Sequence, residues 1–530
     1  MHTATSRKSS PGNIVDYLFE GRQTPAEAAR TYLTTPSGDH SFGELYAWTC
    51  KIGHLLRSSG ITTGDRVMFS VSDGLDFPAI FLAVMKVGAV SLPINTFLKA
   101  KDYAYYLKDS GAKAVIVDAG LAPVFRDVVT GVDSVKQVFV ADGEESGFRS
   151  LEEAARSMPA TLDTLARAPQ DAAFWLYSSG STGDPKGVVH THDHIYWATE
   201  LFGIGAQGVT RDDVILCPPK MFFAFGLGNQ VYFPLRTGAR VITDPAPARV
   251  DSVLAHVIKH RPTVFVAVPT VYAGLLNLMR DMDPQIVRNA CGRLKTCVSG
   301  GEVLPPSLLR SWRELTGVDI RDGVGTTEMT HMFIINQPGK VVPGSCGRLV
   351  DGFSARLVDD DWNDVKQGDV GNLFAAGPTA ASQYWNKPER TLATMRDGGV
   401  LTGDKFYQDP DGNYFYVGRN DDMLRVGGIW VSPAEIESAL AEDPRVLECA
   451  VIGHADENLM VKPKAYVILR PGIIPSVELG EEMRAQMRER LAHYKCPRWI
   501  EFLDELPKTA TGKIQRFRLR ETAAAKSAHA

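Results

Sequence analysis

Short runs rich in β-branched residues alternate with helical patterns through the first three quarters of this chain. The runs are RVMFSV (66–71), AVIVDA (114–119), VKQVFVA (135–141), TVFVAVP (263–269) and KTCVS (295–299). Between the first two runs, the helical stretch DFPAIFLAVMKVG has a proline near its start and a glycine at its end, the usual punctuation of a helix. This alternation predicts an α/β fold with mixed, largely parallel sheets covered by helices.

The pattern changes after GNYFYVGRNDDMLRVGG (412–428), where charges and paired glycines interrupt it. The residues that follow read as helix, strand, strand, helix and strand. The segment VSPAEIESAL begins a helix with Ser432 as its N-cap and Pro433 at its first position. The sequence therefore predicts a small α+β domain behind a hinge.

Length and charge limit the classes of protein that this chain can be. At 530 residues it exceeds the size at which single hydrophobic cores stop growing, so we expect at least two domains. The 57 basic and 62 acidic side chains nearly balance, which disfavours a nucleic-acid partner. Seven cysteines, none spaced as CxxC, are typical of reduced thiols, and no apolar stretch resembles a signal peptide or a membrane span. We expect a soluble cytoplasmic protein without a membrane partner.

The stretch LYSSGSTGDPKGVVHTH (176–192) combines small residues with one fixed lysine, behind the apolar run AAFWLY. Glycines can turn successive backbone N–H groups toward one point, and hydroxyls add further donors, so such a loop can embrace a polyphosphate. It is not a Walker P-loop, because Lys186 is followed by Gly187. The alternative is a flexible surface loop, which the flanking strands and the lysine disfavour.

The segment RDGVGTTEM (321–329) places glycines beside a Thr-Thr-Glu run. Threonine hydroxyls can hold an α-phosphate, and the carboxylate of Glu328 is a suitable ligand for Mg²⁺, which prefers oxygen donors. Taken alone, the same run is more often a turn or a helix cap.

Two later segments add polar groups of the same kind. In LTGDKFYQDPDGNYFYVGRNDDMLRVGG, Asp404 can accept hydrogen bonds from a ribose diol and Arg419 can donate to the sugar or to a phosphate. The alternative there is a hairpin turned at DPDG with an ordinary ion pair. LPKTATGKIQR (506–516) is a lysine-bearing glycine loop, or alternatively an exposed basic turn.

These four stretches, in this order and over nearly the whole chain, resemble the adenylate-forming acyl-CoA synthetase family, which also contains luciferases and the adenylation domains of peptide synthetases. The resemblance implies an N-terminal domain that binds ATP and the acid, residues 1–419, and a mobile C-terminal lid, residues 420–530, with a hinge near Asp421. DGVGTTEMTHMFIIN and KMFFAFGLGN further resemble the benzoate-CoA ligase branch, whose substrates are small aromatic carboxylic acids.

The resemblance also implies roles for individual residues. Those matched to ATP binding are Ser178, Ser179, Thr182 and Lys186 in the phosphate loop, Gly300, Gly301 and Glu302 along the adenine, Asp322 beside it, and Asp404 and Arg419 at the ribose.

Further roles belong to the reaction itself. Thr327 matches the threonine at the α-phosphate, Glu328 the Mg²⁺ ligand and Lys513 the catalytic lysine of the lid. Gly427 and Gly428 match the lid face that lines the pantetheine tunnel.

For the aryl pocket we expect six residues from the two branch-specific segments, namely Ala224, Phe225, Gly226, Val324, Gly325 and His331. Plain core packing is the alternative at each of them. Many relatives carry an adenine-stacking aromatic residue where this chain has Val324, so we expect weaker stacking on that face. Phe225 cannot hydrogen-bond a ring hydroxyl, which favours benzoate or an ortho-substituted relative such as 2-aminobenzoate over 4-hydroxybenzoate.

The implied activity is that of an ATP-dependent aryl-CoA ligase. The carboxylate attacks the α-phosphorus of ATP and releases pyrophosphate, and the thiol of CoA then attacks the aryl-AMP and releases AMP. The implied cofactors and co-substrates are ATP, Mg²⁺ and CoA, in a monomer or homodimer. Two alternatives stay open: an enzyme that loads the pantetheine arm of a carrier protein, and a non-catalytic nucleotide-binding protein, against which Lys186, Glu328 and Lys513 argue.

Overall fold

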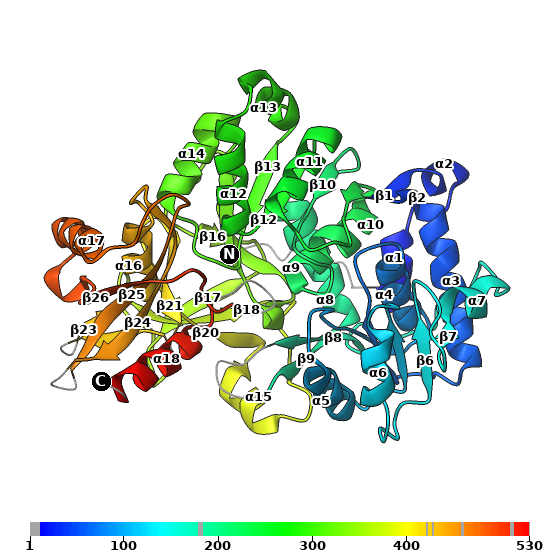
Figure 1. The fold of residues 1–530 in the computed structure, drawn as a ribbon. Coiled ribbons are helices and arrows are strands. Elements are labelled where there is room, and N and C mark those ends of the chain that lie inside the picture. The colour runs from blue at the N-terminus through cyan, green and yellow to red at the C-terminus, as the bar shows by residue number, and fades with distance from the viewer. Residues whose placement is uncertain are drawn as a thin grey trace, which may run out of the picture.

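The computed structural model of the chain describes residues 11–178, 184–419, 422–426, 429–456, 460–508 and 514–528. Figure 1 shows two large sheets with their helices at the centre and right, and a smaller group of C-terminal elements at the left. All five runs expected as strands form strands, and the α/β fold class is confirmed.

The first sheet has seven strands. Their order is β7 (Arg149–Ser150), β6 (Gln137–Val140), β5 (Ala114–Val117), β3 (Arg66–Ser70), β4 (Val90–Pro93), β8 (Ala172–Ser178) and β9 (Lys186–Thr191). Neighbouring strands are parallel except the last pair, β8 and β9, which is antiparallel. The stretch that the sequence singles out for phosphate binding thus includes the paired ends of two antiparallel strands at the edge of the sheet.

The second sheet has nine strands. Their order is β16 (Arg348–Leu349), β15 (Met332–Ile335), β14 (Ile320–Gly325), β13 (Thr296–Ser299), β12 (Val264–Ala267), β10 (Val214–Leu216), β11 (Arg240–Ile242), β1 (Thr31–Thr35) and β2 (Gly38–Ser41). The strands from β14 to β1 run parallel, and the pairs at both ends are antiparallel.

Alternate residues of the central strands face different helical layers, because side chains alternate across a strand. In β5, Ile116 belongs to the cluster between the two sheets, whereas Val115 packs with α5 (Ala100–Ser110) and α6 (Ala122–Val128) on the outer face. In β12, Val266 faces the inner layer and Phe265 the outer helices α11 (Val250–His260), α12 (Pro269–Arg280), α13 (Pro284–Cys291) and α14 (Pro306–Thr316).

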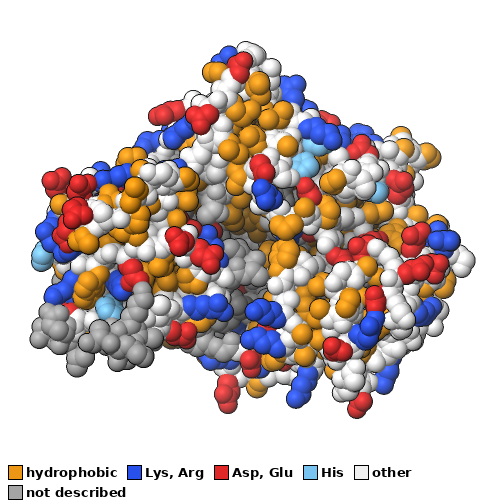
Figure 2. Space-filling view, viewed as in Figure 1, with side chains coloured by type: hydrophobic (Ala, Val, Ile, Leu, Met, Phe, Trp, Pro, Cys, Tyr) orange, Lys and Arg blue, Asp and Glu red, His pale blue; other side chains and the backbone are white. Residues whose placement is uncertain are grey.

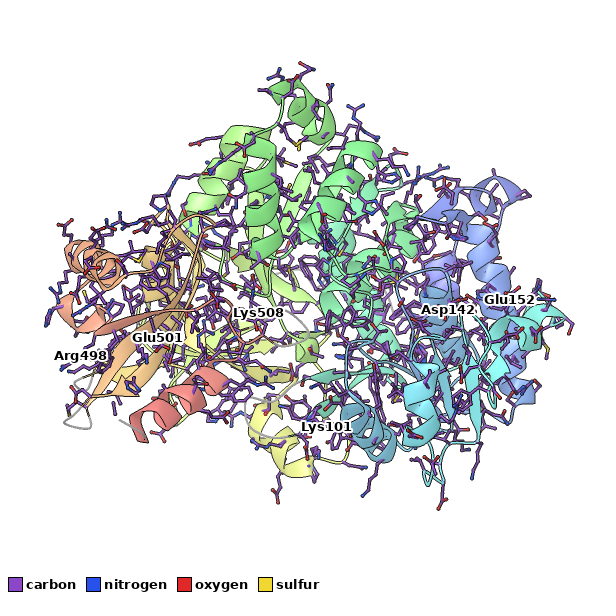
Figure 3. The ribbon with its side chains drawn as sticks, in the orientation of Figure 1. Lys101, Asp142, Glu152, Arg498, Glu501 and Lys508 are labelled. Atoms are coloured by element: carbon purple, nitrogen blue, oxygen red, sulfur yellow. The ribbon has the colours of Figure 1, made fainter. Side chains whose placement is uncertain are left out.

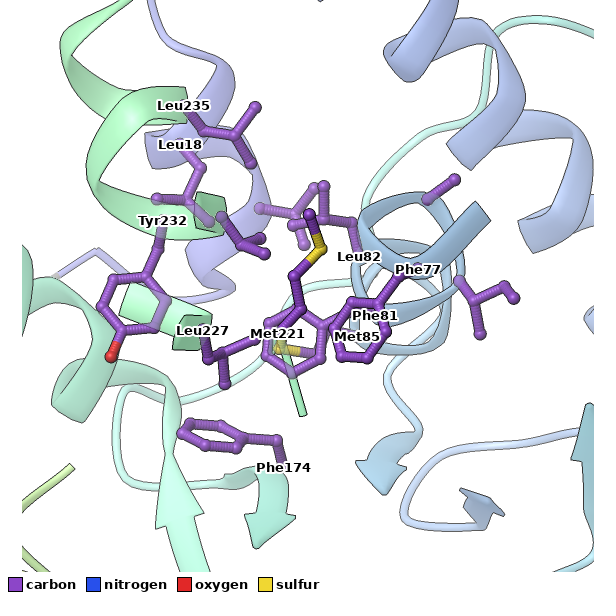
Figure 4. Close-up of a cluster of buried hydrophobic side chains, with 14 of the residues drawn as sticks. Leu18, Phe77, Phe81, Leu82, Met85, Phe174, Met221, Leu227, Tyr232 and Leu235 are labelled. Atoms are coloured by element: carbon purple, nitrogen blue, oxygen red, sulfur yellow. The ribbon is translucent and has the colours of Figure 1, made fainter. Parts of the chain in front are cut away.

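The inner layer holds the largest hydrophobic cluster. Figure 4 shows part of it, where Phe77, Phe81 and Met85 of α4 (Asp76–Lys86) meet Phe174 of β8 and Met221. The other helices of this half are α1 (Ile14–Phe19), α2 (Pro25–Ala28), α3 (Phe42–Ser58), α7 (Leu151–Arg156), α8 (His192–Trp197), α9 (Ala224–Leu227) and α10 (Phe233–Thr237). Two π-helices, η1 (Ala198–Ala206) and η2 (Gly228–Tyr232), adjoin α8 and α9.

An antiparallel sheet, which the sequence patterns do not predict, follows the nine-stranded sheet. Its strands are β17 (Ser354–Val358), β18 (Gly371–Ala376), β19 (Met395–Arg396), β20 (Gly399–Gln408) and β21 (Tyr414–Arg419), with α15 (Pro388–Thr394) before β19. β20 and β21 form the hairpin expected at DPDG.

The C-terminal elements follow the predicted order of helix, strand, strand, helix and strand. They are α16 (Pro433–Leu440), β24 (Val446–Ala455), β25 (Val461–Leu469), α17 (Val477–Arg490) and β26 (Trp499–Phe502), preceded by β22 (Leu424–Val426) and β23 (Ile429–Val431) and followed by α18 (Arg516–Ala528). The Ser432 hydroxyl accepts from the backbone N–H of Glu435, so the predicted cap of α16 is confirmed. The boundary at 419/420 stays a prediction.

Charged side chains of this C-terminal part pair with one another. Figure 3 labels Arg498, Glu501 and Lys508 there. Their partners are Asp456 at 3.5 Å, Lys464 at 2.8 Å and Glu448 at 2.8 Å, respectively. Within the described ranges, no helix is both long and apolar enough to cross a membrane.

Candidate active site

The predicted phosphate loop connects two paired strand ends. Ser178, the last residue of β8, lies opposite Lys186, the first residue of β9. Tyr105 donates from its hydroxyl to the carbonyl oxygen of Pro185 at 2.8 Å and so holds the base of the turn. Both ends of the loop belong to strands, and the alternative of a flexible surface loop stays open for the residues between them. Ser179 and Thr182 lie outside the described residues.

The hydroxyl of Ser178 reaches the candidate metal ligand. It donates to Oε1 of Glu328 at 3.2 Å, and the hydroxyl of Tyr384 donates to the same oxygen at 2.8 Å. Glu328 lies in the short 3₁₀-helix η3 (Thr327–Met329), which Thr326 caps by accepting from the N–H of Met329. The helix-cap reading is therefore correct as a description of the backbone, and it leaves Thr327 and Glu328 half-exposed beside the phosphate loop.

Positive charge gathers on the same side. The Nζ of Lys186 lies 4.3 Å from the centroid of the Tyr384 ring. Burial lowers the pKa of Lys186, the carboxylate of Glu328 opposes that shift, and the positive charges of Arg390 and Arg419 add to it. Neighbouring positive charges repel one another and so lower the pKa of the lysine, and an anion bound between them offsets this repulsion. The cluster therefore suits a polyphosphate.

The predicted adenine segment lies against the Thr-Thr-Glu segment. Strands β13 and β14 pair in parallel with Ser299 opposite Asp322, so Gly300 comes next to Gly323. A side-chain carbon at Gly300 would lie 2.2 Å from the Met332 methyl and 3.2 Å from the carbonyl oxygen of Gly323. A side chain at position 300 would therefore have to displace the end of the Met332 side chain and would press against the backbone of Gly323.

Gly301 and Glu302 continue the adenine segment. Gly301 has a φ of 85°, a left-handed conformation that favours glycine. Glu302 is half-buried. Asp322, at the neighbouring strand, is buried, and burial raises the pKa of its carboxyl to about 8 against hydrogen bonds from Ser299, Gly323 and Cys346.

Asp404 and Arg419 face each other across the β20–β21 hairpin. Their side chains form an ion pair of 3.3 Å, with the carboxylate buried and the guanidinium half-exposed. The hairpin and the ion pair of the alternative reading are both present, and the ribose contacts stay a prediction. The influence of Arg419 on the pKa of Lys186 puts this pair within electrostatic reach of the phosphate loop.

The branch-specific segments meet around His331. Its ring centroid lies 5.8 Å from that of Phe225, 4.6 Å from Phe202 and 4.9 Å from Phe233. A Gly300 side-chain carbon would lie 3.9 Å from Phe225, so the aromatic cluster adjoins the adenine segment. Ala224 and Val324 are half-buried at the same junction.

Two of the expected pocket glycines lie where the backbone of another residue approaches closely. A side-chain carbon at Gly226 would lie 2.0 Å from the carbonyl oxygen of Lys220, and one at Gly325 would lie 2.8 Å from that of His331. The preceding loop therefore leaves no room for a side chain at Gly226, and the expected place of Gly226 and Gly325 in the aryl pocket stays a prediction. Gly228 allows the His331 ring to pack directly against the backbone, since such a carbon there would lie 2.6 Å from Cδ2 of the ring.

Some predicted residues lie outside the described residues, namely Lys513, the hinge residue Asp421, and Gly427 and Gly428 of the CoA tunnel. Their roles stay predictions. Figure 2 shows a hollow at the centre of one face, between the C-terminal elements on the left and the large sheets on the right, with basic side chains along its lower rim.

Sequence reasoning missed Tyr384 and Arg390. Tyr384 contacts both Glu328 and Lys186, yet it is 56 residues from Glu328 along the chain and sits in no motif that we selected. An isolated β-bridge between Val188 and Tyr384 brings it to the edge strand β9. The only local signal for Tyr384 in the run YWNKPER is a pair of aromatic residues ahead of a proline.

Comparison with known proteins bears on these sites. The AMP-binding enzyme family matches residues 20–385, and the AMP-binding enzyme C-terminal domain matches residues 435–513. A benzoate-CoA ligase of Thauera aromatica is 41% identical over 513 residues, 96% of this chain and 95% of the relative. A 4-hydroxybenzoate-CoA/benzoate-CoA ligase of Rhodopseudomonas palustris is 37% identical, over 92% of this chain and 89% of the relative.

Solved structures agree over almost the full length. An anthranilate CoA ligase in complex with anthranoyl-AMP has a TM-score of 0.92 and 39% identity, covering 98% of this chain and 99% of that chain. A benzoate CoA ligase of Burkholderia xenovorans has a TM-score of 0.88 and 37% identity, covering 96% of this chain and 99% of that chain. With both family domains in order and these relatives matched from end to end, the chain belongs to the AMP-binding enzymes, in the branch of the benzoate-CoA ligases.

Proposed function

We propose that the protein is an ATP-dependent aryl-CoA ligase that activates a small aromatic acid as aryl-AMP and then forms the aryl-CoA thioester. The observation that supports this most directly is the junction at Gly300, where the adenine segment lies against the aromatic cluster of Phe225 and His331. An acid bound in that cluster would have its carboxylate directed toward the nucleotide. The relatives act on benzoate, hydroxybenzoates and anthranilate, acids of one size and shape.

In the first half-reaction two anions must meet, because the carboxylate of the acid attacks the negatively charged α-phosphate. Lys186 and Arg390 would hold the phosphates that leave as pyrophosphate, and the Thr327 hydroxyl would donate to the α-phosphate. Lys513, carried by the lid, would supply the charge between carboxylate and phosphate. One preorganised contact of this kind is typically worth about 3 to 4 kcal/mol of transition-state stabilisation.

Magnesium fits the donor set around Glu328. That carboxylate is half-exposed, oriented by the hydroxyls of Ser178 and Tyr384, and offers an oxygen ligand. No group of three or more ligating side chains occurs among the described residues. A Mg²⁺ ion bound to Glu328 would therefore take its other ligands from phosphate oxygens and water. When bound, Mg²⁺ would neutralise charge on the phosphate oxygens.

In the second half-reaction the thiol of CoA attacks the acyl carbonyl of aryl-AMP, the C–S bond forms, and the C–O bond to AMP breaks. We propose that the lid turns at Asp421 between the two steps, withdrawing Lys513 and presenting Gly427 and Gly428 to the pantetheine arm. The thiol arm of a carrier protein has the same chemistry, and it is the alternative acceptor.

A substrate panel tests the proposal. The full-length protein is incubated with ATP, Mg²⁺ and benzoate, 2-aminobenzoate or each hydroxybenzoate, and aryl-AMP, AMP and thioester are measured with CoA, with a carrier protein and with neither. We expect aryl-AMP without an acceptor and aryl-CoA with CoA. The proposal fails if ATP–pyrophosphate exchange stays at background for every acid, and the acceptor is reassigned if only the carrier protein is loaded.

A further inference from the structure

Asn229 joins the two segments that form the aromatic cluster. It lies in the π-helix η2, directly after α9, and is fully buried. π-helical turns are rare and occur frequently at functional sites. The sequence patterns single out Phe225 and His331, which are 106 residues apart, but not the asparagine that contacts both.

The hydrogen bonds of Asn229 determine which way its amide faces. The Nδ2 atom donates to the carbonyl oxygen of Phe225 at 2.9 Å and lies 3.2 Å from Nε2 of His331. Because a carbonyl oxygen can only accept, the nitrogen of the amide must occupy this corner. Its Oδ1 accepts from Nε2 of Gln207 at 2.7 Å on the other side.

This orientation determines the tautomer of His331. The Asn229 amide nitrogen has two hydrogens, one for Phe225 and one for His331, and no lone pair that could accept. Nε2 of the imidazole is therefore placed to accept from Asn229, and with Nε2 as the acceptor a neutral ring carries its proton on Nδ1. Burial lowers the pKa of His331 to about 3, although an interaction with the backbone carbonyl of Phe225 opposes that shift, so the ring is neutral at physiological pH.

The Nδ1–H group of His331 is then a donor that needs a hydrogen-bond acceptor. The Cδ2–Nε2 edge of the ring faces Gly228 of η2, so the edge with Nδ1 points away from that helix. Nδ1 is buried and has no hydrogen-bond partner in the described part of the chain. Phe202, Phe225 and Phe233 surround the ring, and a buried donor in such apolar surroundings is costly unless a ligand accepts from it.

We propose that Asn229 is a positioning residue of the aryl site, which holds His331 as the Nδ1–H tautomer so that the pocket offers the bound aromatic acid one hydrogen-bond donor within an aromatic wall. The proposal rests on the proposed function, since it assigns the aromatic cluster to the acid. The ligand atom that it requires is an acceptor oxygen, on the carboxylate or on a ring substituent.

The tautomer is measured directly by ¹⁵N NMR. The full-length protein is labelled with ¹⁵N-histidine, and His331→Phe identifies the His331 signals among the 12 histidines. We expect a protonated Nδ1 and an unprotonated Nε2 in the wild-type protein near neutral pH. A proton on Nε2, or an imidazolium, would overturn the proposal. This result does not depend on activity, so it stands apart from a failure of the proposed ligase reaction.

The variant Asn229→Asp tests the consequence. A carboxylate at this corner accepts the ring proton instead of donating, so we expect the proton of His331 to move to Nε2. The KM for the aromatic acid should rise about ten-fold, as for one lost buried hydrogen bond, with the KM for ATP unchanged.

Asn13→Asp is the matched control, because Asn13 is another buried asparagine whose amide donates twice, to the carbonyl oxygens of Met85 at 2.7 Å and Leu165 at 3.0 Å. We expect it to lower stability without changing the KM for the acid or the His331 signals. If Asn229→Asp does not fold, Asn229→Ser takes its place in both measurements. The role of Asn229 would be refuted if the variant kept the wild-type His331 tautomer and the wild-type KM for the acid.

Discussion

Glu328 is held by hydroxyl donors from two distant parts of the chain, Ser178 at 3.2 Å and Tyr384 at 2.8 Å. Groups that hydrogen-bond a metal-binding carboxylate orient it and affect metal affinity strongly. The ring of Tyr384 also lies against Nζ of Lys186, so one residue touches both the carboxylate and the cation of the candidate ATP site. At the scale of single residues, Tyr384 therefore links the candidate metal ligand Glu328 to the candidate phosphate-binding residue Lys186.

Tyr384→Phe removes the hydroxyl and keeps the ring. We expect the Mg²⁺ concentration for half-maximal ATP–pyrophosphate exchange to rise about ten-fold, because Glu328 loses an orienting donor. Tyr177→Phe is the control, since that hydroxyl donates to Asp109 at 2.8 Å instead. An unchanged Mg²⁺ dependence in Tyr384→Phe would argue against Glu328 as the ligand.

Asp322 makes stability depend on pH. Burial raises the pKa of its carboxyl from 3.8 to about 8, so between these values the folded chain binds more protons at this site than the unfolded chain. This contribution is fully present below pH 3.8 and is lost as pH rises through about 8, with a slope of up to about 1.4 kcal/mol per pH unit. We expect Asp322→Asn to remove that slope in urea unfolding followed by tryptophan fluorescence.

The exposed carboxyl of Asp397 provides the comparison, because Asp397→Asn changes the same chemical group at the surface. It should leave the pH dependence of unfolding as in the wild type. If Asp322→Asn and Asp397→Asn behaved alike, the slope would have to originate elsewhere.

Among the elements, the short helix α9 depends on a buried anchor. The Nζ of Lys220 donates to the carbonyl oxygens of Asp244 and Ala246, both at 2.6 Å, and lies 3.6 Å from the carboxylate of Asp73. The carbonyl oxygen of Lys220 in turn accepts from the backbone N–H of Phe223, the residue before α9, at 3.1 Å and packs against Gly226, so the anchor is linked to the start of α9. Since α9 carries Phe225, this anchor sets one wall of the aromatic cluster.

Lys220→Met removes the cation and leaves the Asp73 carboxylate buried without it. Breaking one partner of a buried pair typically costs about 3 to 5 kcal/mol, and we expect a loss of stability in that range together with a higher KM for the aromatic acid. Adding Asp73→Asn should recover part of the loss. Additive effects in the double variant, measured by urea unfolding, would contradict an energetic coupling between the two side chains.

On the scale of the whole molecule, the C-terminal part is tied together near the predicted hinge. Arg516 donates to both carboxylate oxygens of Glu437, at 2.8 and 2.7 Å, and lies 3.7 Å from Asp422, which also accepts from Arg520 at 3.0 Å. These pairs bind α16, α18 and the residue after Asp421 to one another. They suit a lid that turns as a unit.

Asp421→Pro restricts the backbone at the predicted hinge. We expect thioester formation from supplied aryl-AMP to fall at least about ten-fold, with a smaller effect on aryl-AMP formation, since only the second step needs the rotated lid. Lys513→Ala should show the opposite split, losing adenylation and keeping thioester formation. Both steps are measured by quenched-flow product analysis, and an equal loss in both steps for either variant would refute its assigned role.

The sequence by itself determined the α/β fold class, the five expected strands, the elements of the C-terminal part and the four glycine-rich or charged stretches. These follow from local causes, since periodicity, helix caps and the residue types of a phosphate-binding loop are all written in neighbouring residues. Only the tertiary structure decided which side chains meet. Tyr384 reaches Glu328, Gly228 packs against the His331 ring, and Asn229 joins two segments about a hundred residues apart. Such contacts depend on how strands and helices are stacked, and no local pattern of residues reports that.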